Sequence, residues 1–187
     1  MDIYFLRHAS AGQHTTDPKK DEKRPIDKAG EKQSHDIGRA LAALQVELDV
    51  ALSSKLTRAM QTAEIVLAEM GYKDRLITDE AMRPESGYEQ FQRLLSNYAD
   101  KKSILVVGHN PSITDFVTQM LLSKGGREFL DFKKGAVAKI ETDGEHATLK
   151  WFLTPKMARA LLHGKAGKSV LAKSSVRASP VSNRNKH

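Results

Sequence analysis

The sequence lacks several features that would place it in other classes of protein. Its 187 residues include no cysteine, which excludes disulfide bonds, thiolate zinc sites and cysteine nucleophiles. No apolar run approaches the roughly 18 residues of a membrane span, and the first residues lack the basic segment and cleavage site of a signal peptide. A chain of this length buries roughly 70% of its unfolded surface without a metal or a disulfide. We therefore expect a cytoplasmic protein built around one domain.

The positive charge is concentrated at one end of the chain. The sequence has 30 Lys and Arg against 23 Asp and Glu, a net charge of +7. Eight of the basic residues lie in 156–187, which has no acidic residue, so 1–155 carry 22 basic against 23 acidic residues. We predict a domain over 1–155 and a basic C-terminal extension over 156–187, flexible from about 166. The extension is either a solvated appendage or a contact for an acidic partner or nucleic acid.

Short apolar runs alternate with amphipathic segments along 1–155. Strands are predicted at 3–6, 50–52, 104–107, 136–141 and 147–153, the last two around the turn signal Asp143-Gly144. Helices are predicted at 29–48, 59–70, 88–98, from Asn110-Pro111 to 122, and for a turn or two within 156–163. This alternation predicts an α/β fold, a three-layer α/β/α sandwich with a mostly parallel central sheet.

Polar clusters follow three of the predicted strands. Arg7 and His8 end the first strand, Ser54 and Arg58 follow the second, and His109 follows the third. Ligands of parallel α/β sheets bind at the carboxyl ends of the strands, so we expect Arg7, His8, Arg58 and His109 to converge. Because the set has no carboxylate and no HExxH helix, we expect neither a metal nor another cofactor there.

Two arginines and two histidines suit phosphoryl chemistry. Arginine forks bind phosphate oxygens in pairs, and fixed cations stabilise the charge on a transferring phosphoryl group. A neutral imidazole can attack phosphorus and form a covalent phosphohistidine. The residue types therefore indicate a metal-independent phosphohydrolase.

Three motifs carry a resemblance to a known family. FLRHASAG resembles the Arg-His-Gly signature of the histidine phosphatase superfamily, which has the phosphoglycerate-mutase-like fold. SSKLTRAMQTAEIV resembles its second motif, and VVGHNP resembles the motif of its second histidine. The resemblance covers about residues 1–155, and the short body is most similar to the small SixA-type phosphohistidine phosphatases. Two residues depart from the family pattern: Ala9 stands in place of glycine and Lys55 in place of proline.

By position, the resemblance implies a role for each motif residue. His8 is the covalent nucleophile, Arg7 and Arg58 bind the phosphoryl group, and His109 donates to its oxygens. Ser54 occupies the motif serine. Arg24, in the Arg-Pro pair before the first long helix, is expected to contact the substrate.

The general acid is left open. Glu85 stands where larger relatives place that acid, Glu80 is the alternative, and several small relatives lack one. An absent acid would select phosphohistidine or acyl phosphates, because imidazole (pKa roughly 6.5) is a far better leaving group than an alkoxide. We assign no function to His14 and interpret Lys133-Lys134 as a solvated turn.

The resulting prediction is removal of a phosphoryl group from a protein phosphohistidine through a covalent phosphohistidine intermediate. A small-molecule phosphomonoesterase of the same superfamily is the alternative within the enzyme class. A protein of a different class would use the basic extension to bind nucleic acid or an acidic partner, with a steep dependence on salt.

Overall fold

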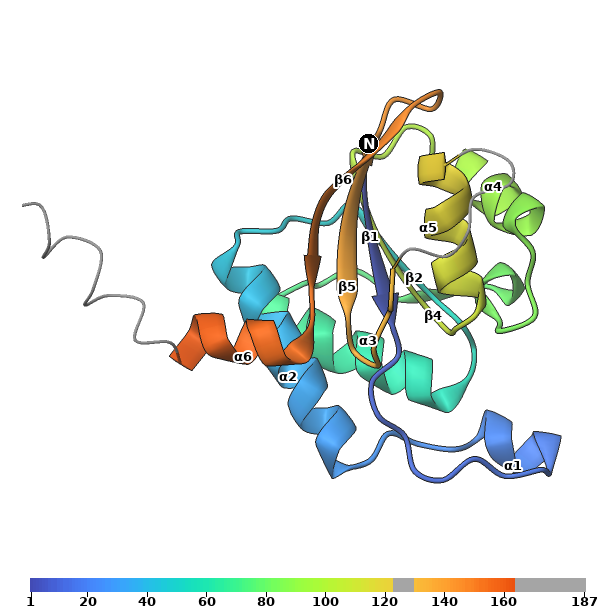
Figure 1. Cartoon of the computed structure of the whole chain (residues 1–187), viewed down its shortest axis with the longest axis vertical. Helices are drawn as coiled ribbons and strands as arrows, with labels where there is room; N and C mark the ends of the chain where they lie inside the picture. Colours follow the sequence, from blue (N-terminus) through green and yellow to red (C-terminus); the bar gives the residue numbers. More distant parts are fainter. Residues whose placement is uncertain (123–129, 164–187) are drawn as a thin grey trace, which may run out of the picture.

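The apolar runs of the sequence pair into one six-stranded sheet (Figure 1). The computed structural model describes residues 1–122 and 130–163, so the segment expected to be flexible, 166–187, lies outside the described residues. The strands, in chain order, are β1 (Asp2–Arg7), β2 (Val50–Ser53), β3 (Ile77–Thr78), β4 (Ser103–Gly108), β5 (Val137–Thr142) and β6 (Ala147–Leu153).

Helices cover both faces of this sheet (Figure 1). They are α1 (Pro18–Glu22), α2 (Lys28–Ala43), α3 (Thr57–Met70), α4 (Tyr88–Ser96), α5 (Ser112–Leu122), α6 (Pro155–His163) and the 3-10 turn η1 (Glu80–Met82). None of the helices within 1–122 and 130–163 is both long enough and apolar enough to cross a membrane.

The strand order, β3-β2-β4-β1-β5-β6, brings β1 and β4 side by side at the centre of the sheet. β1, β2, β3 and β4 run parallel, whereas β5 pairs antiparallel with both β1 and β6. The predicted three-layer sandwich with a mostly parallel sheet is therefore confirmed. Because β1, β2 and β4 share one direction, their carboxyl ends open onto the same edge of the sheet.

Alternation of side chains along the central strands builds two apolar cores. Ile3 and Phe5 face α4 and α5, where Phe91 stacks on Phe116 with ring centroids 4.6 Å apart. Tyr4 and Leu6, one residue out of phase, face the opposite core, which takes in apolar residues of α2, α3 and α6. This two-residue period is what buries β1 on both faces.

The helices differ from their predicted bounds at several ends: α3 begins at Thr57 instead of 59, and α4 ends at Ser96 instead of 98. α2 ends at Ala43 rather than at 48, because Gln45 adopts a positive φ of 54°. Leu48 still packs against the core from the connecting segment, so its spacing from Leu41 and Leu44 resembled a continuing helix, although Leu44 itself is exposed. α5 begins at Ser112, so Pro111 lies in the preceding turn and not in the first helical position.

The described part of the basic extension packs on the domain. Ala158 of α6 is buried among apolar residues of α2 and α3. Arg159 Nε donates to the buried Asp36 of α2 at 2.8 Å. Residues up to His163 therefore belong to the folded body, and we place the start of any independent extension after that residue.

Candidate active site

The pairing of β1 with β4 brings the first and third motifs together. Arg7 lies opposite Gly108 in this pairing, so His8 and His109 leave neighbouring strands at the same level. The backbone N–H of His8 donates to the Gly108 carbonyl at 2.9 Å, and the two imidazole centroids are 4.9 Å apart. Both histidines are buried.

The second motif reaches the same place through β2 and α3. Arg58 lies in the first turn of α3, and its side chain is only 6% exposed. Thr62, one turn further on, ties this helix to the loop after β1. Its hydroxyl accepts from the Ala9 N–H at 3.0 Å and donates to the Arg58 carbonyl at 2.6 Å.

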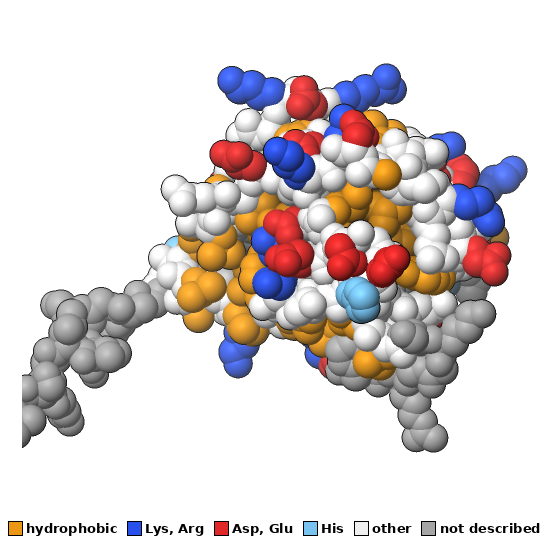
Figure 2. Space-filling model, turned by 90° about the horizontal axis from the view of Figure 1, so that it is seen from above, with side chains coloured by type: hydrophobic (Ala, Val, Ile, Leu, Met, Phe, Trp, Pro, Cys, Tyr) orange, Lys and Arg blue, Asp and Glu red, His pale blue; other side chains and the backbone are white. Residues whose placement is uncertain are grey.

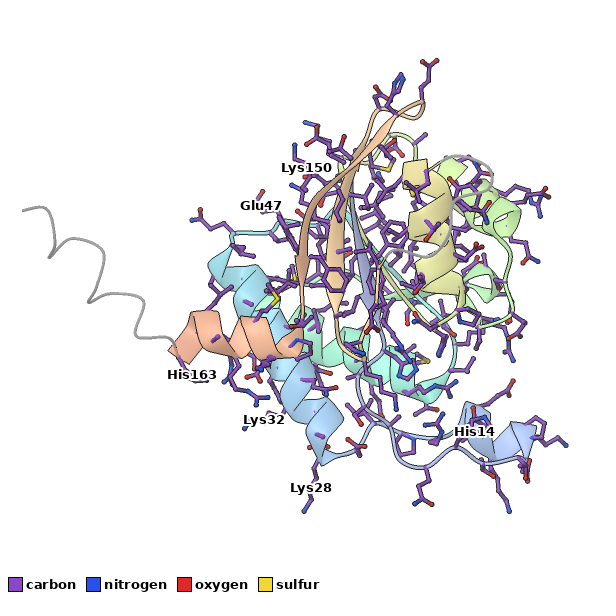
Figure 3. All side chains as sticks on the ribbon, in the orientation of Figure 1. His14, Lys28, Lys32, Glu47, Lys150 and His163 are labelled. Atoms are coloured by element: carbon purple, nitrogen blue, oxygen red, sulfur yellow. The ribbon has the colours of Figure 1, made fainter. Side chains whose placement is uncertain are left out.

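A pocket of about 370 Å³ lies at this edge of the sheet. Arg7, His8, Arg24, Arg58 and His109, all singled out from the sequence, line it. The sequence interpretation assigned no site role to the other residues that line the pocket: Gly12, His14, Asp21, Pro84, Asn110 and Lys134. Figure 3 shows His14 beside α1, below the carboxyl ends of the strands.

His8 is held in one tautomer. Its Nδ1 lies 2.7 Å from the carbonyl oxygen of Ala9, which can only accept, so Nδ1 carries the proton. Burial lowers the pKa of His8 to about 3, and the charges of Arg58 and Arg7 act in the same direction. The ring is therefore neutral at pH 7, and Nε2 keeps its lone pair.

His109 is neutral as well. Burial lowers its pKa to about 2, with further contributions from His8 and Arg58. Both of its ring nitrogens are buried and have no hydrogen-bond partner among the described residues. Unpartnered buried polar atoms are rare and costly, so we interpret His109 as a group that contacts the ligand rather than a structural histidine.

Arg7 and Arg58 share one arrangement. In each guanidinium, Nη1 is anchored to the protein: that of Arg7 donates to the Phe132 carbonyl at 2.5 Å, and that of Arg58 donates to the Asp21 carbonyl at 2.9 Å. The Nε atoms of both arginines are buried with no partner among the described residues. Burial lowers the pKa of both groups, but arginine stays protonated in proteins. The site thus presents two fixed, partly unsatisfied cations to an anion.

The two candidate acids do not line the pocket. Glu85 is 67% exposed and lies 2.7 Å from Arg83 Nε. Glu80 is 59% exposed and pairs with Lys55 Nζ at 2.7 Å. The carboxylate that does line the pocket is Asp21, which neither motif nor spacing indicated.

Ser54 and Arg24 lie in different settings. Ser54 is fully buried outside the pocket lining, and its Oγ accepts from the Leu56 N–H at 3.3 Å, which shapes the turn into α3. Arg24 lines the pocket, with its side chain 13% exposed. Within 1–122 and 130–163, no group of three or more His, Asp or Glu side chains could hold a metal ion.

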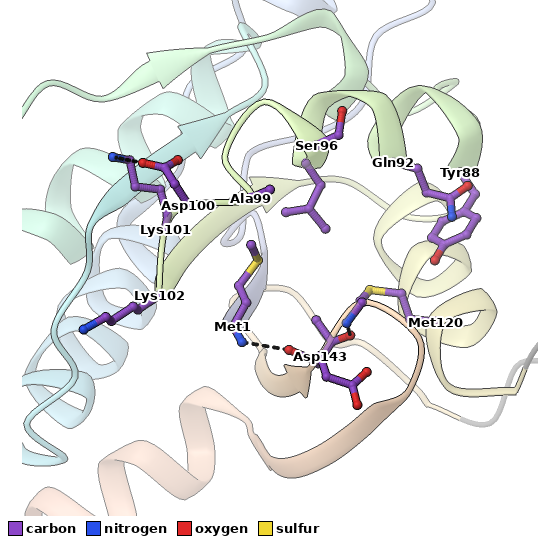
Figure 4. Close-up of a pocket in the computed structure, with 13 residues that line it drawn as sticks. Met1, Tyr88, Gln92, Ser96, Ala99, Asp100, Lys101, Lys102, Met120 and Asp143 are labelled. Carbon is purple, nitrogen blue, oxygen red and sulfur yellow. Dashed lines mark hydrogen bonds and ion pairs between the residues drawn. The ribbon is translucent and has the colours of Figure 1, made fainter.

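A larger pocket, of about 550 Å³, lies at the opposite edge of the sheet. Figure 4 shows Met1, Tyr88 and Met120 around it, with the Met1 ammonium donating to the Thr142 carbonyl at 2.7 Å. Figure 2 shows that face, on which exposed apolar side chains are surrounded by charged ones. Neither motif histidine reaches this pocket, so we assign the phosphoryl chemistry to the smaller one.

Acidification is expected to destabilise the protein through its two buried histidines. In the unfolded chain each takes up a proton near pH 6.5, whereas in the folded chain the pKa values are about 3 and about 2. The unfolded state therefore binds more protons below pH 6.5, and stability falls as the pH drops toward 3. From pH 7 to 4.5 we expect a loss of about 2 kcal/mol per histidine.

Urea unfolding of the wild type and of His109→Gln at these two pH values measures this loss. The variant should lose less stability on acidification than the wild type, because one titrating group is gone. His35→Gln, at a half-exposed position on α2, is the control. An equal loss in wild type and His109→Gln would contradict the assignment of His109 as a buried neutral group.

Comparisons with known proteins agree with this geometry. A family model described as "Histidine phosphatase superfamily (branch 1)" matches residues 3–92. An uncharacterized protein of Picosynechococcus sp. (strain PCC 7002) is 29% identical over 168 residues, which are 82% of this chain and 99% of that protein.

Solved structures share the fold. The protein histidine phosphatase SixA complexed with tungstate superimposes with a TM-score of 0.75 at 23% identity, over 83% of this chain and 98% of that one. The alpha-ribazole phosphatase from Shigella flexneri gives a TM-score of 0.66 at 16% identity, over 83% and 97%. The phosphoglycerate mutase from Bacillus anthracis gives 0.63 at 13% identity, over 84% and 95%. These likenesses confirm the predicted phosphoglycerate-mutase-like fold.

Proposed function

We propose that the chain is a phosphatase of the histidine phosphatase superfamily, whose family model matches residues 3–92, and that it dephosphorylates protein phosphohistidine without a metal. The observation that carries the proposal is His8: a buried neutral imidazole whose Nδ1 is bonded to the Ala9 carbonyl, so that Nε2 is free to attack. Two anchored arginines lie beside it in the same pocket.

In the first step, His8 Nε2 attacks phosphorus in line with the leaving nitrogen. The substrate phosphohistidine carries a proton on its other ring nitrogen. A bond forms between Nε2 and phosphorus while the bond from phosphorus to the substrate imidazole breaks, and its electron pair returns to that imidazole, which leaves as a neutral ring. Arg7 and Arg58 bind the equatorial oxygens through their Nε atoms, which have no partner among the described residues. The neutral His109 donates one N–H to the same oxygens. Arg7 and Arg58 are charged and held in place before the reaction begins, so the site reorganises little as the transition state forms.

In the second step, water takes the place of the departed imidazole. Its oxygen attacks phosphorus opposite His8, the bond to Nε2 breaks, and inorganic phosphate forms. His8 returns to the neutral tautomer that the Ala9 carbonyl favours. The same arginines stabilise both transition states, because the phosphoryl oxygens stay in place while the entering and leaving groups exchange.

The charge state of the pocket supports a labile phosphoryl donor. Burial opposes ionisation of Asp21, but the hydrogen bond from Arg24 and the charges of Arg58 and Arg24 outweigh it and lower its pKa. Asp21 is therefore ionised at neutral pH and has no proton to give. With Glu80 and Glu85 outside the pocket, no carboxylic acid among the described lining residues protonates a leaving group. Phosphohistidine needs the least help, because neutral imidazole leaves readily.

A small phosphate ester is the second candidate substrate. The pocket volume of about 370 Å³ lies at the lower end of the range for small-molecule sites, so size alone admits one. Chemistry favours the protein substrate, because an alkoxide leaving group requires the acid that the pocket lacks.

Turnover assays test the proposal. The full chain is incubated with a phosphohistidine-bearing protein and with para-nitrophenyl phosphate, each with and without EDTA. We expect phosphate release from the phosphohistidine protein that EDTA does not alter. Absence of turnover of any phosphorylated compound, or loss of turnover with EDTA, would overturn the proposal.

A further inference from the structure

We propose that Asp21 is a positioning residue that holds Arg58 and Arg24 for the phosphoryl group, an inference that rests on the proposed function. Its carboxylate serves the two arginines with separate oxygens. Oδ2 lies 3.2 Å from Arg58 Nη1, and Oδ1 lies 2.8 Å from Arg24 Nε. The backbone carbonyl of Asp21 also accepts from Arg58 Nη1, at 2.9 Å. Arg58 is thus held from one end while its Nε is left free.

Arg24 extends this arrangement to the loop that follows the nucleophile. Its Nη1 donates to the carbonyls of Ala11 and Gly12, at 2.7 and 3.1 Å. Asp21 therefore joins Arg58, on α3, to the segment just after His8. A shift of this one carboxylate would remove one contact from each arginine and leave only their bonds to backbone carbonyls.

The short helix α1 is attached mainly through charged groups. None of its residues is buried. Besides Asp21, the neighbouring Glu22 pairs with Arg83 Nη2 at 2.6 Å. With so little apolar burial to hold it, the position of α1 depends on these ion pairs. We infer that α1 serves to deliver the Asp21 carboxylate to the arginines.

Asp21 also has an electrostatic cost for the ligand. Its side chain is 15% exposed, and its negative charge lies beside the site where a phosphoryl dianion binds. Like charges in one pocket repel, so Asp21 lowers the affinity for phosphate while it orients the arginines. The two effects predict that a neutral substitute changes binding and turnover in opposite directions.

The variant Asp21→Asn separates the positioning of the arginines from the repulsion of phosphate. An amide has one acceptor oxygen where the carboxylate has two, so it cannot serve Arg58 and Arg24 together. We expect kcat to fall roughly tenfold because the arginines lose their alignment. Inorganic phosphate, titrated by calorimetry, should bind about tenfold more tightly because a nearby negative charge is gone. Asp17→Asn is the matched control. Asp17 caps α1 and forms an exposed pair with Lys20 on the same helix, it does not line the pocket, and asparagine caps equally well.

The outcomes are distinct. Tighter phosphate binding with a lower kcat supports the inference. Weaker phosphate binding with a lower kcat would indicate a collapsed pocket and overturn it, as would a variant identical to the wild type. Because calorimetry needs no turnover, tighter binding in a protein that hydrolyses nothing would refute the proposed function and leave the role of Asp21 intact.

Two further variants keep the test decisive. Asp21→Glu retains both carboxylate oxygens and should recover kcat above that of Asp21→Asn; equal values would overturn the inference. Combining Asp21→Asn with Arg58→Lys should lower kcat by less than the product of the two single effects, because both act on one group. Effects that multiply would show that Asp21 does not act through Arg58.

Discussion

Replacing His8 by alanine is expected to lower phosphate release by at least about ten-thousand-fold, the scale seen when a catalytic nucleophile is removed. His8 is the neutral imidazole whose Nε2 has been left without a proton by the Nδ1 contact with Ala9. Water is a poor replacement, because no lining carboxylate is free to activate it. Steady-state phosphate release measures the loss. Separation of labelled protein under alkaline conditions, in which phosphohistidine survives, measures the phosphoenzyme, which the variant should not form.

His146→Ala is the control for this experiment. His146 lies in the turn between β5 and β6 with an 83% exposed side chain, far from the carboxyl ends of the parallel strands. It should keep wild-type turnover. A His8→Ala protein that retained a tenth of the activity would assign the nucleophile to another residue, and His109 would then be the next to examine.

The convergence of His8 and His109 could be predicted from the sequence for a simple reason. Both follow apolar strands that are buried on both faces, and such strands lie at the centre of a parallel sheet. The carboxyl ends of these two strands then lie side by side, and this can be predicted without knowing how the loops fold. Arg58 follows the same logic, one strand further out.

Asp21 and Lys134 could not be found in this way. Asp21 lies in a five-residue helix without a buried face, so it leaves no apolar period in the sequence. Lys134 was interpreted as part of a solvated turn, yet it lines the pocket, because Gly135 next to it bonds back to the carbonyls of Arg7 and His8. Contacts between loops that are far apart in the sequence leave no pattern in either segment from which they could be predicted.

The two glutamates show a limit of positional analogy. Glu80 and Glu85 both lie close to the pocket in sequence terms, but Arg83 between them pairs with each, at 3.6 and 2.7 Å. The hydrogen bonds that Arg83 donates to Glu22 and Glu85 raise the pKa of Arg83. A cation two or three residues from a carboxylate can form an ion pair with it. The ion pairs with Arg83 hold the side chains of Glu80 and Glu85 away from the pocket.

The wild-type enzyme is expected to hydrolyse phosphohistidine at least roughly a thousandfold more efficiently, in kcat/KM, than an alkyl phosphate. A positioned general acid is worth roughly a hundredfold to ten-thousandfold in rate, and the one carboxyl group among the described lining residues, Asp21, is ionised. The penalty falls only on leaving groups that need a proton, so acyl phosphates should group with phosphohistidine. A screen of phosphohistidine protein, acetyl phosphate and a sugar phosphate measures the order.

Glu85→Gln and Glu80→Gln decide whether the acid is truly missing. If neither glutamate protonates the leaving group, both variants should keep wild-type kcat/KM on every substrate, because their contacts lie with Arg83 and Lys55 outside the pocket. A Glu85→Gln variant inactive on the sugar phosphate but active on phosphohistidine would instead make Glu85 an acid for P–O bonds. That result would require Arg83 to release Glu85 when a substrate binds, and it would move the preferred substrate toward small phosphate esters.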